Sequence, residues 1–238
     1  MQRIIILMCL VLALSGCEKV VELDRIQDRN GVAYLPNSTT PFSGKVEDRY
    51  ENGQLKYEAI HKNRDGAQES VVRTFYESNG QLKTEGTYKN GKEEGLGRDW
   101  YENGQLEIEA TYKNGEFEGP LKNWYENGQL NMEGTYKNDK QDGLFQVRGE
   151  DGQLTTETNF KNDKKDGLRR NWHENGQLEF EGTYKNGKFN GLIRYWRENG
   201  QLENELTYKD EELDGLWRKW DENGQLKFED TYKDGVKQ

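Results

Sequence analysis

One four-residue motif, Asn-Gly-Gln-Leu, returns at a fixed interval along most of this 238-residue chain. It begins at Asn52, Asn79, Asn103, Asn127, Asn175, Asn199 and Asn223, and Asp151 takes the place of asparagine once. The first interval is 27 residues and the six that follow are 24 residues each. Self-similarity at such a period is the signature of a repeat protein. One unit cannot bury an apolar surface alone, so the chain must fold as a linear array of neighbouring units.

Each unit contains two turn signals, for example Glu102-Asn103-Gly104 and Lys113-Asn114-Gly115. Asn-Gly between extended, aromatic-rich segments is the strongest short-range hairpin signal, so each unit predicts two antiparallel strands. Eight units then give about 16 strands at ~4.8 Å each, a ribbon roughly 75 Å long. The predicted fold class is all-β: an elongated single-layer antiparallel β-meander of about eight two-strand repeats.

Two strand registers compete at the Glu-Asn-Gly turn. A two-residue loop places Glu109 opposite Arg98 and creates a cross-strand ladder of charges, whereas a three-residue loop pairs Trp100 with Leu106. Burying a large apolar side chain stabilises a fold by roughly 1.5–3 kcal/mol, and an exposed ion pair contributes only about 0.2–1 kcal/mol. We therefore expect the second register.

That register divides the side chains of a unit between two faces. One face, expected on the concave side of the twisted ribbon, would carry the apolar residues Leu96, Trp100, Leu106, Ile108 and Tyr112. The opposite face would carry the polar residues Gln105, Glu109, Thr111 and Lys113.

The first 16 residues have the composition of a cleaved leader: Met1-Gln2-Arg3 is basic, and an apolar run follows from Ile4 to Leu14. This run is too short to span a bilayer as a permanent helix. Leu14-Ser15-Gly16-Cys17 resembles a bacterial lipobox, which implies lipid attachment at Cys17. The expected segments are a lipoprotein signal peptide at 1–16, a tether and N-terminal cap at 17–45, and the repeat array at 46–238.

The formal net charge of −10 argues against nucleic acid as a partner, because nucleic-acid binding needs a clustered basic face. It also leaves membrane attachment to the lipid anchor. Hydrophobic residues make up only 32% of the chain, which approaches the composition of a disordered protein. The 6 Trp, 13 Tyr and 8 Phe recur at fixed positions of the repeat, and this argues for folding.

The unit Gly-Leu-x-x-x-Trp-Tyr-Glu-Asn-Gly-Gln-Leu-x-x-Glu-x-x-Tyr-Lys-Asn-Gly resembles the bacterial variant of the MORN repeat, from about Arg29 to Lys237. The segments Arg29 to Tyr34 and Pro41 to Lys45 resemble the opening of bacterial YwqK-type proteins, which carry an antitoxin name. The resemblance implies an interaction module. An antitoxin would meet an intracellular toxin in the cytosol, whereas the lipobox implies that this chain leaves the cytosol. The lipobox therefore favours a scaffold over an antitoxin. One unit, with Arg148-Gly149-Glu150-Asp151, departs from the pattern and interrupts the aromatic row.

No residue combination suggests catalysis or a metal site, so neither an enzyme activity nor a cofactor is expected. His61 and His173 each occupy a tyrosine position of the repeat and lie too far apart in the array to share a site. The glutamates at the position of Glu109 recur two strands apart, about 10 Å, whereas calcium needs its oxygen ligands within ~2.6 Å.

The aromatic rows are the remaining candidate for function. They either form the thin core or remain uncovered as a partner-binding surface, and both interpretations can hold together. The candidate residues are Trp100, Trp124, Trp172, Trp196, Trp220, Tyr112, Tyr136, Tyr184 and Tyr208.

We therefore expect an envelope lipoprotein, held at the outer membrane or at a periplasmic face of the bacterial cell envelope. Its repeat ribbon would act as a non-enzymatic protein-interaction scaffold. The alternatives are a glycan- or peptidoglycan-binding protein, since exposed rings also stack on sugars, and an immunity-type protein that neutralises a toxin.

Overall fold

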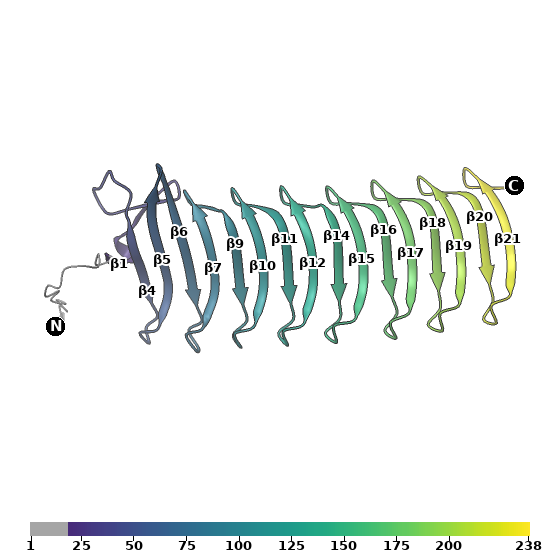
Figure 1. The fold of residues 1–238 in the computed structure, drawn as a ribbon, viewed down its shortest axis with the longest axis horizontal. Coiled ribbons are helices and arrows are strands. Elements are labelled where there is room, and N and C mark those ends of the chain that lie inside the picture. The colour runs from purple at the N-terminus through teal and green to yellow at the C-terminus, as the bar shows by residue number, and fades with distance from the viewer. Residues whose placement is uncertain (1–18) are drawn as a thin grey trace.

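The repeat array is one open β-sheet whose strands lie side by side across the long axis of the molecule (Figure 1). The computed structural model describes residues 19–238, so the predicted leader and Cys17 lie outside the described residues. The main sheet has 20 strands, of which four, β1, β8, β13 and β22, are only two or three residues long. The other 16 are the two strands expected for each of eight units, and the predicted fold class is confirmed.

The strands of the array follow one another in chain order. The first units contain β4 (Gly44–Arg49), β5 (Leu55–Arg64), β6 (Ala67–Phe75), β7 (Leu82–Lys89), β8 (Lys92–Glu93), β9 (Gly95–Trp100), β10 (Leu106–Lys113) and β11 (Glu116–Trp124). The middle units contain β12 (Leu130–Lys137), β13 (Lys140–Gln141), β14 (Gly143–Arg148), β15 (Leu154–Lys161) and β16 (Lys164–Trp172). The last units contain β17 (Leu178–Lys185), β18 (Lys188–Trp196), β19 (Leu202–Lys209), β20 (Glu212–Trp220), β21 (Leu226–Lys233) and β22 (Val236–Lys237).

The segment before the array packs against its first strands. It contains β1 (Val20–Glu22), the 3₁₀ helix η1 (Leu23–Arg25), β2 (Gln27–Arg29) and β3 (Val32–Tyr34). β1 pairs in parallel with β4, and β2 pairs with β3 in a separate hairpin. Ala33, Phe42, Val46 and Ala59 are each at most 5% exposed and form one cluster. In residues 19–238, no helix is long and apolar enough to cross a membrane.

The Glu-Asn-Gly turns have the predicted three-residue form. The Tyr101 N–H donates to the Gln105 carbonyl over 2.9 Å, and the Gly104 N–H donates to the Tyr101 carbonyl over 2.9 Å. Gly104 has φ of 83°, a left-handed conformation that glycine adopts without a steric cost. The Lys-Asn-Gly turns are two-residue turns, in which Asn114 and Gly115 both have positive φ.

Both competing registers occur in the same hairpin, because a bulge separates them. Trp100 pairs with Leu106 next to the turn, and the register then shifts by one residue at Glu107. Beyond this shift, Glu109 lies opposite Arg98. The extra residue of a bulge is left unpaired, so one strand can satisfy two registers. The prediction treated the registers as exclusive, and that was wrong.

The bulge also overturns the predicted division of side chains between faces. Trp100 shares a face with Arg98 and Leu96, since these residues alternate along β9. Tyr112 lies on the other face, because a Cβ atom added to Gly97 would lie 2.8 Å from its ring. We call the first surface the ladder face, defined by the Arg98–Glu109 pairs and their equivalents, and the second the aromatic face, defined by Tyr112 and its equivalents. Ile108 lies on the aromatic face, whereas Glu109 and Thr111 lie on the ladder face.

Most of the buried core of the array lies along one row of residues that crosses the middle of the aromatic face, which we call the central row. Each long strand contributes one residue to this row, and each of these residues lies opposite the next one across the sheet. In strand order they are Val46, Ala59, Val72, Gly86, Gly97, Ala110, Leu121, Gly134, Phe145, Thr158, Arg169, Gly182, Ile193, Leu206, Trp217 and Asp230. Ala110 and Ile193 are each 1% exposed although the array is one layer thick. Ile193 packs in one cluster with Phe180, Tyr184 and Leu206.

Candidate interaction faces

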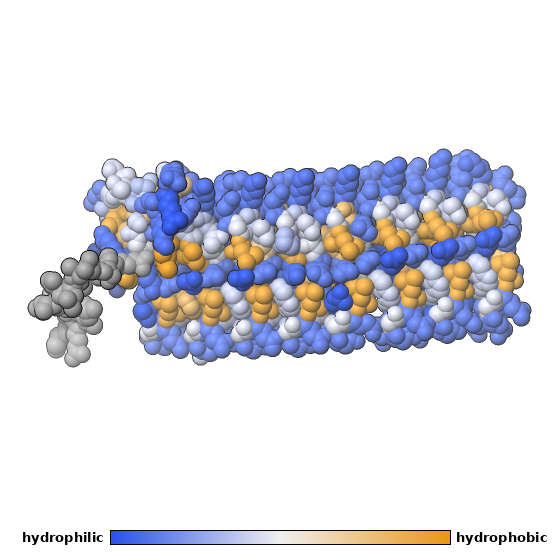
Figure 2. Space-filling view, viewed as in Figure 1, coloured by the Kyte–Doolittle hydropathy of each residue, from blue (hydrophilic) through white to orange (hydrophobic). Residues whose placement is uncertain are grey.

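Charged residues form a nearly continuous ladder along the middle of the ladder face. Arg194 bonds Glu205 at 2.9 Å, and Glu205 also bonds Arg218 of the next hairpin at 3.1 Å. The same alternation extends through Lys45, Glu58, Arg73 and Glu85 near the N-terminal end, and through Glu157, Arg170 and Glu181 in the middle. Figure 2 shows a hydrophilic line along the whole array with a more apolar band on each side.

Glu58 shows how the ladder holds its carboxylates in the charged form. This residue is only 9% exposed, and burial alone would raise its pKa. Hydrogen bonds from Lys45 and Arg73 outweigh burial and hold the pKa below its usual value. The recurring glutamates are therefore structural partners of cross-strand cations.

A row of tryptophans runs beside this ladder, at the ends of the strands that lead into the Glu-Asn-Gly turns. Each tryptophan pairs with a leucine across the turn: Trp100 with Leu106, Trp124 with Leu130, Trp172 with Leu178, Trp196 with Leu202 and Trp220 with Leu226. All five tryptophans are half-buried. Arg148 takes the tryptophan position in one unit, opposite Leu154, and interrupts the row.

A tyrosine directly after β4, β6, β9 and β11 joins one unit to the next: Tyr50, Tyr76, Tyr101 and Tyr125. The Tyr101 hydroxyl donates to the Trp124 carbonyl over 2.7 Å, and the Tyr76 hydroxyl donates to the Trp100 carbonyl over 2.6 Å. His173 makes the equivalent contact through Nε2 to the Trp196 carbonyl at 2.9 Å. His173 therefore keeps the structural contact of the tyrosine position that it occupies.

The asparagine of the repeated motif has two fixed partners, which explains its recurrence. Asn103 Oδ1 accepts the Gln105 N–H at 2.9 Å, and Asn103 Nδ2 donates to the Glu126 carbonyl of the next turn at 2.8 Å. Asp151 has no amide to donate, and Gln153 Nε2 donates to the Glu174 carbonyl instead.

The aromatic face holds the four predicted tyrosines and several rings that the sequence reasoning missed. The Tyr112 ring lies 4.8 Å from Phe117, and Phe117 lies 5.4 Å from Tyr136. A second run contains Tyr184, Phe189 and Tyr208, with centroid distances of 4.6 and 5.5 Å. Trp217 also lies on this face, 5.0 Å from Phe228. The nine predicted partner-binding residues therefore lie on two opposite faces and do not form one surface.

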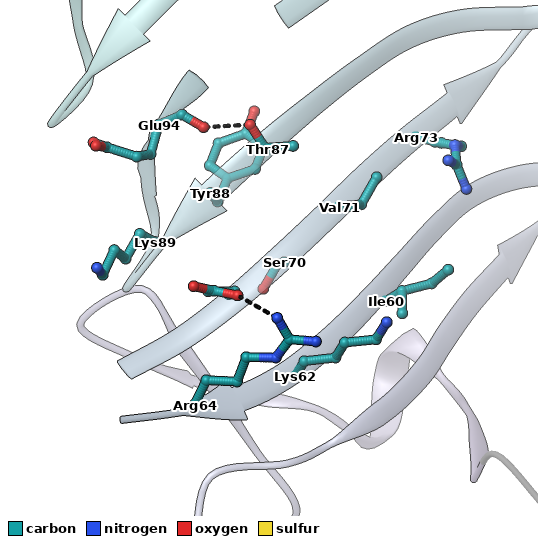
Figure 3. A pocket seen from close by; sticks show the side chains of 11 residues that line it. Ile60, Lys62, Arg64, Ser70, Val71, Arg73, Thr87, Tyr88, Lys89 and Glu94 are labelled. Carbon is teal, nitrogen blue, oxygen red and sulfur yellow. Dashed lines mark hydrogen bonds and ion pairs between the residues drawn. The ribbon is translucent and has the colours of Figure 1, made fainter. Parts of the chain in front are cut away.

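A hollow of about 420 Å³ lies on the ladder face near the N-terminal end. Figure 3 shows Lys62 and Arg64 of β5 near Ser70 and Val71 of β6, with Lys89 of β7 on the far side. Arg64 is held loosely by Glu69, at 4.0 Å. Lys62 and Lys89 occupy a lysine position that every unit repeats.

His61 and His173 lie in different units, as expected, and His61 Nδ1 lies 2.7 Å from the Ser70 hydroxyl. Within residues 19–238, no group of three or more His, Cys, Asp or Glu side chains is arranged to hold a metal ion.

The fold and its two faces define a class: an open β-repeat array that offers a long surface for binding. The profile of the MORN repeat variant family matches residues 43–63, 71–90, 93–114, 117–138, 165–186, 189–210 and 213–234, which is more than half of the chain. The chain therefore belongs to the MORN repeat variant family. The matches omit the unit with Arg148, although β13 to β15 continue the sheet through it. A comparison with curated proteins gives no match.

Proposed function

We propose that this protein is a lipid-anchored component of the bacterial envelope whose ribbon binds another protein through the tryptophan row of the ladder face. The observation that carries the proposal is the row itself. Five half-buried tryptophans recur along the ladder face, each beside a leucine and with one interruption at Arg148, and no second layer covers them among the described residues. Buried aromatic anchors of this kind carry much of the binding free energy in protein interfaces.

The ladder face suits a partner better than the aromatic face does. The rings of the aromatic face pack on one another and cover the central row, so they are needed for folding. The five tryptophans of the row make none of the ring contacts found within residues 19–238. The ladder charges are paired within the chain, so a partner could cover them without leaving a charge unpaired.

Tyr195 and Trp196 provide a matched test, because adjacent residues of β18 point to opposite faces. Tyr195 contacts Phe180 on the aromatic face, and Trp196 pairs with Leu202 on the ladder face. The chain from Glu18 onward would be used to capture a partner from envelope extract. Trp196→Ala should weaken capture by at least tenfold, because an anchor contributes roughly 2 kcal/mol. Tyr195→Ala should keep capture near wild type.

Circular dichroism controls for folding, since Trp→Ala can also cost several kcal/mol of stability. Binding is compared at a temperature where both variants give the wild-type spectrum. If Tyr195→Ala loses capture and Trp196→Ala keeps it, the partner binds the aromatic face instead.

The glycan alternative is supported by the same rings, since tryptophan also stacks on sugars. Peptidoglycan or chitin fragments should leave tryptophan fluorescence unchanged if the partner is a protein, including an incoming toxin. A saturable shift that Trp196→Ala abolishes would establish glycan binding instead.

The anchor rests on Leu14-Ser15-Gly16-Cys17, outside the described residues. β1 begins at Val20, so a lipid on Cys17 would hold the capped end of the array near the membrane. The full chain expressed in bacteria with a fatty-acid analogue should incorporate the label at Cys17. Cys17→Ser should incorporate no label. If this variant is still labelled, the lipoprotein assignment is wrong.

A further inference from the structure

The central row of the aromatic face has a gap near the N-terminal end of the array. Gly86 of β7 and Gly97 of β9 are neighbours in this row, since Glu85 pairs with Arg98 and Thr84 with Asp99. Ala110 follows Gly97, so three small residues lie in succession. A hollow of about 200 Å³ remains above Gly86 and Gly97. The rings of Tyr88 and Tyr112 border it, and a Cβ atom added at Gly86 or Gly97 would lie 3.1 or 2.8 Å from them.

Three departures from the repeat coincide at this hollow. The position of Gly97 is filled in later units by Leu121, Phe145, Arg169, Ile193 and Trp217. In the later units the position of Asp99 is taken by Asn123, Val147, Asn171, Tyr195 and Lys219, although the first unit also has an aspartate there, Asp48. The position of Glu93 is taken in the later units by Phe117, Gln141, Lys165, Phe189 and Leu213. One departure removes a side chain and two introduce carboxylates, and all three residues line the same hollow.

The carboxylates at the hollow have little compensation from the chain. Asp99 has no hydrogen bond or ion pair with any residue that the structure describes, and Glu93 accepts only the Tyr88 hydroxyl, at 3.1 Å. Burial raises the pKa of Asp99, and the positive charge of Lys83 partly opposes this. The other charged residues at the rim, Glu85 and Arg98, are engaged on the ladder face, by Arg73 and Glu109.

Tyr88 and Tyr112 line the hollow with uncharged rings. Burial, together with the charge of Glu93, raises the pKa values of Tyr88 and Tyr112 to about 12. Both phenols therefore stay protonated at physiological pH and present uncharged ring surfaces. Aromatic faces attract cations, and carboxylates strengthen that preference while repelling anions. A metal ion is disfavoured, because a calcium or magnesium site needs more oxygen ligands than two carboxylates supply.

We propose that this hollow binds a protonated alkylamine, with the ammonium group between the Tyr88 and Tyr112 rings and against the carboxylates of Asp99 and Glu93. The ammonium belongs to a lysine side chain of a polypeptide or to a free amine. Ammonium suits the small hollow because it is a compact charge with three donors. The site lies on the face opposite the tryptophan row, so it does not depend on the function proposed above.

Backbone NMR tests this directly, since the Gly86 and Gly97 amides report on the hollow. The probes are Nα-acetyl-lysine methylamide, its norleucine analogue without the charge, and n-butylamine. The lysine probe should shift both glycine resonances saturably, and the norleucine probe should shift neither. Butylamine binding as tightly as the lysine probe would identify a free-amine site, and binding tenfold weaker would identify a site for lysine side chains. Equal shifts with norleucine, or no shift with either amine, overturn the proposal.

Two variants separate charge from space. Asp99→Asn keeps the shape and should weaken lysine-probe binding at least tenfold. Gly97→Leu introduces the residue found at Leu121. Its Cβ atom would lie 2.8 Å from the Tyr112 ring, so this ring must move, and the variant should lose binding. Glu126→Gln, an exposed turn position, makes the same change in net charge and should bind like wild type. Wild-type affinity in Asp99→Asn overturns the proposal, even where Gly97→Leu fails to fold.

Discussion

Tyr101 and its equivalents Tyr50, Tyr76 and Tyr125 each join one unit to the next through a single hydroxyl group. The Tyr101 hydroxyl donates to the backbone carbonyl of Trp124 in the next unit, at 2.7 Å. A hydrogen bond of this kind contributes about 1 kcal/mol, and a buried acceptor left without a donor costs a similar amount or more. Repeated along the array, the bond couples neighbouring units.

We expect Tyr101→Phe to lower the free energy of unfolding by about 1 kcal/mol, because it removes only the hydroxyl. Denaturant unfolding measures the change. Tyr136→Phe is the matched control, since the Tyr136 hydroxyl has no hydrogen bond in the described chain, and it should be near neutral. Equal losses in the two variants would show that the ring, and not the bond to the next unit, determines stability.

His61 makes the first unit sensitive to mild acid. Burial lowers its pKa, so the folded state favours the neutral imidazole. Below the unfolded pKa of about 6.5 the unfolded chain binds the proton first, and stability falls as the pH decreases from about 7 to 5.5.

His61→Tyr introduces the residue of the later units and should remove this pH dependence. Thermal midpoints at pH 7.5 and 5.5 test it, with His173→Tyr as the control histidine substitution. A wild-type loss that persists in His61→Tyr would assign the acid sensitivity to other groups.

At the scale of strands and turns, the Asn-Gly signals were sufficient to predict the 16 long strands and the three-residue turns. They act locally, since Asn103 and Gly104 satisfy their own turn. The two faces could not be predicted in this way. The bulge at Glu107 keeps both the Trp100–Leu106 pair and the Arg98–Glu109 pair, and this position is also Asn, Thr or Lys in other units, so no residue type marks it.

The hollow on the aromatic face also could not be predicted from the sequence of a single unit. Gly86, Glu93 and Asp99 come from successive strand segments, and their proximity depends on the pairing of β7 with β9. The sequence does contain a usable signal, namely the coincidence of three departures from the repeat within seven residues, Glu93 to Asp99.

The hairpin is the unit of assembly, so whole units should be removable. Deleting the 24 residues from Leu192 to Gly215 joins Gly191 to Leu216, and the ladder and the central row then continue in register. We expect this variant to keep a β-sheet dichroism spectrum and cooperative unfolding. Deleting only Leu192 to Glu203 removes half a unit, reverses the strand direction beyond it and should lose the cooperative transition. Equal unfolding of both variants would mean that the two-strand hairpin is not the building block.

At the scale of the molecule, a single-layer ribbon has two independent surfaces and no interior between them. The ladder face has internally paired charges and a tryptophan row, whereas the aromatic face contains the core and one gap in its central row. Side chains on opposite faces of a strand do not contact one another. Occupancy of one face therefore has no direct steric route to the other.

This separation predicts that both proposed sites can be occupied at once. Saturating lysine probe should leave protein capture unchanged, and Asp99→Asn should capture like wild type. Conversely, Trp196→Ala should lose capture while the lysine probe still shifts Gly86 and Gly97, because Trp196 lies four repeat units from Trp100, the tryptophan of the unit that contains the hollow. Capture assays with and without the probe, and NMR titration of Trp196→Ala, make the comparison. Competition between the probe and the captured protein would show that the partner inserts its own cation into the hollow, and the aromatic face would then replace the ladder face as the binding surface.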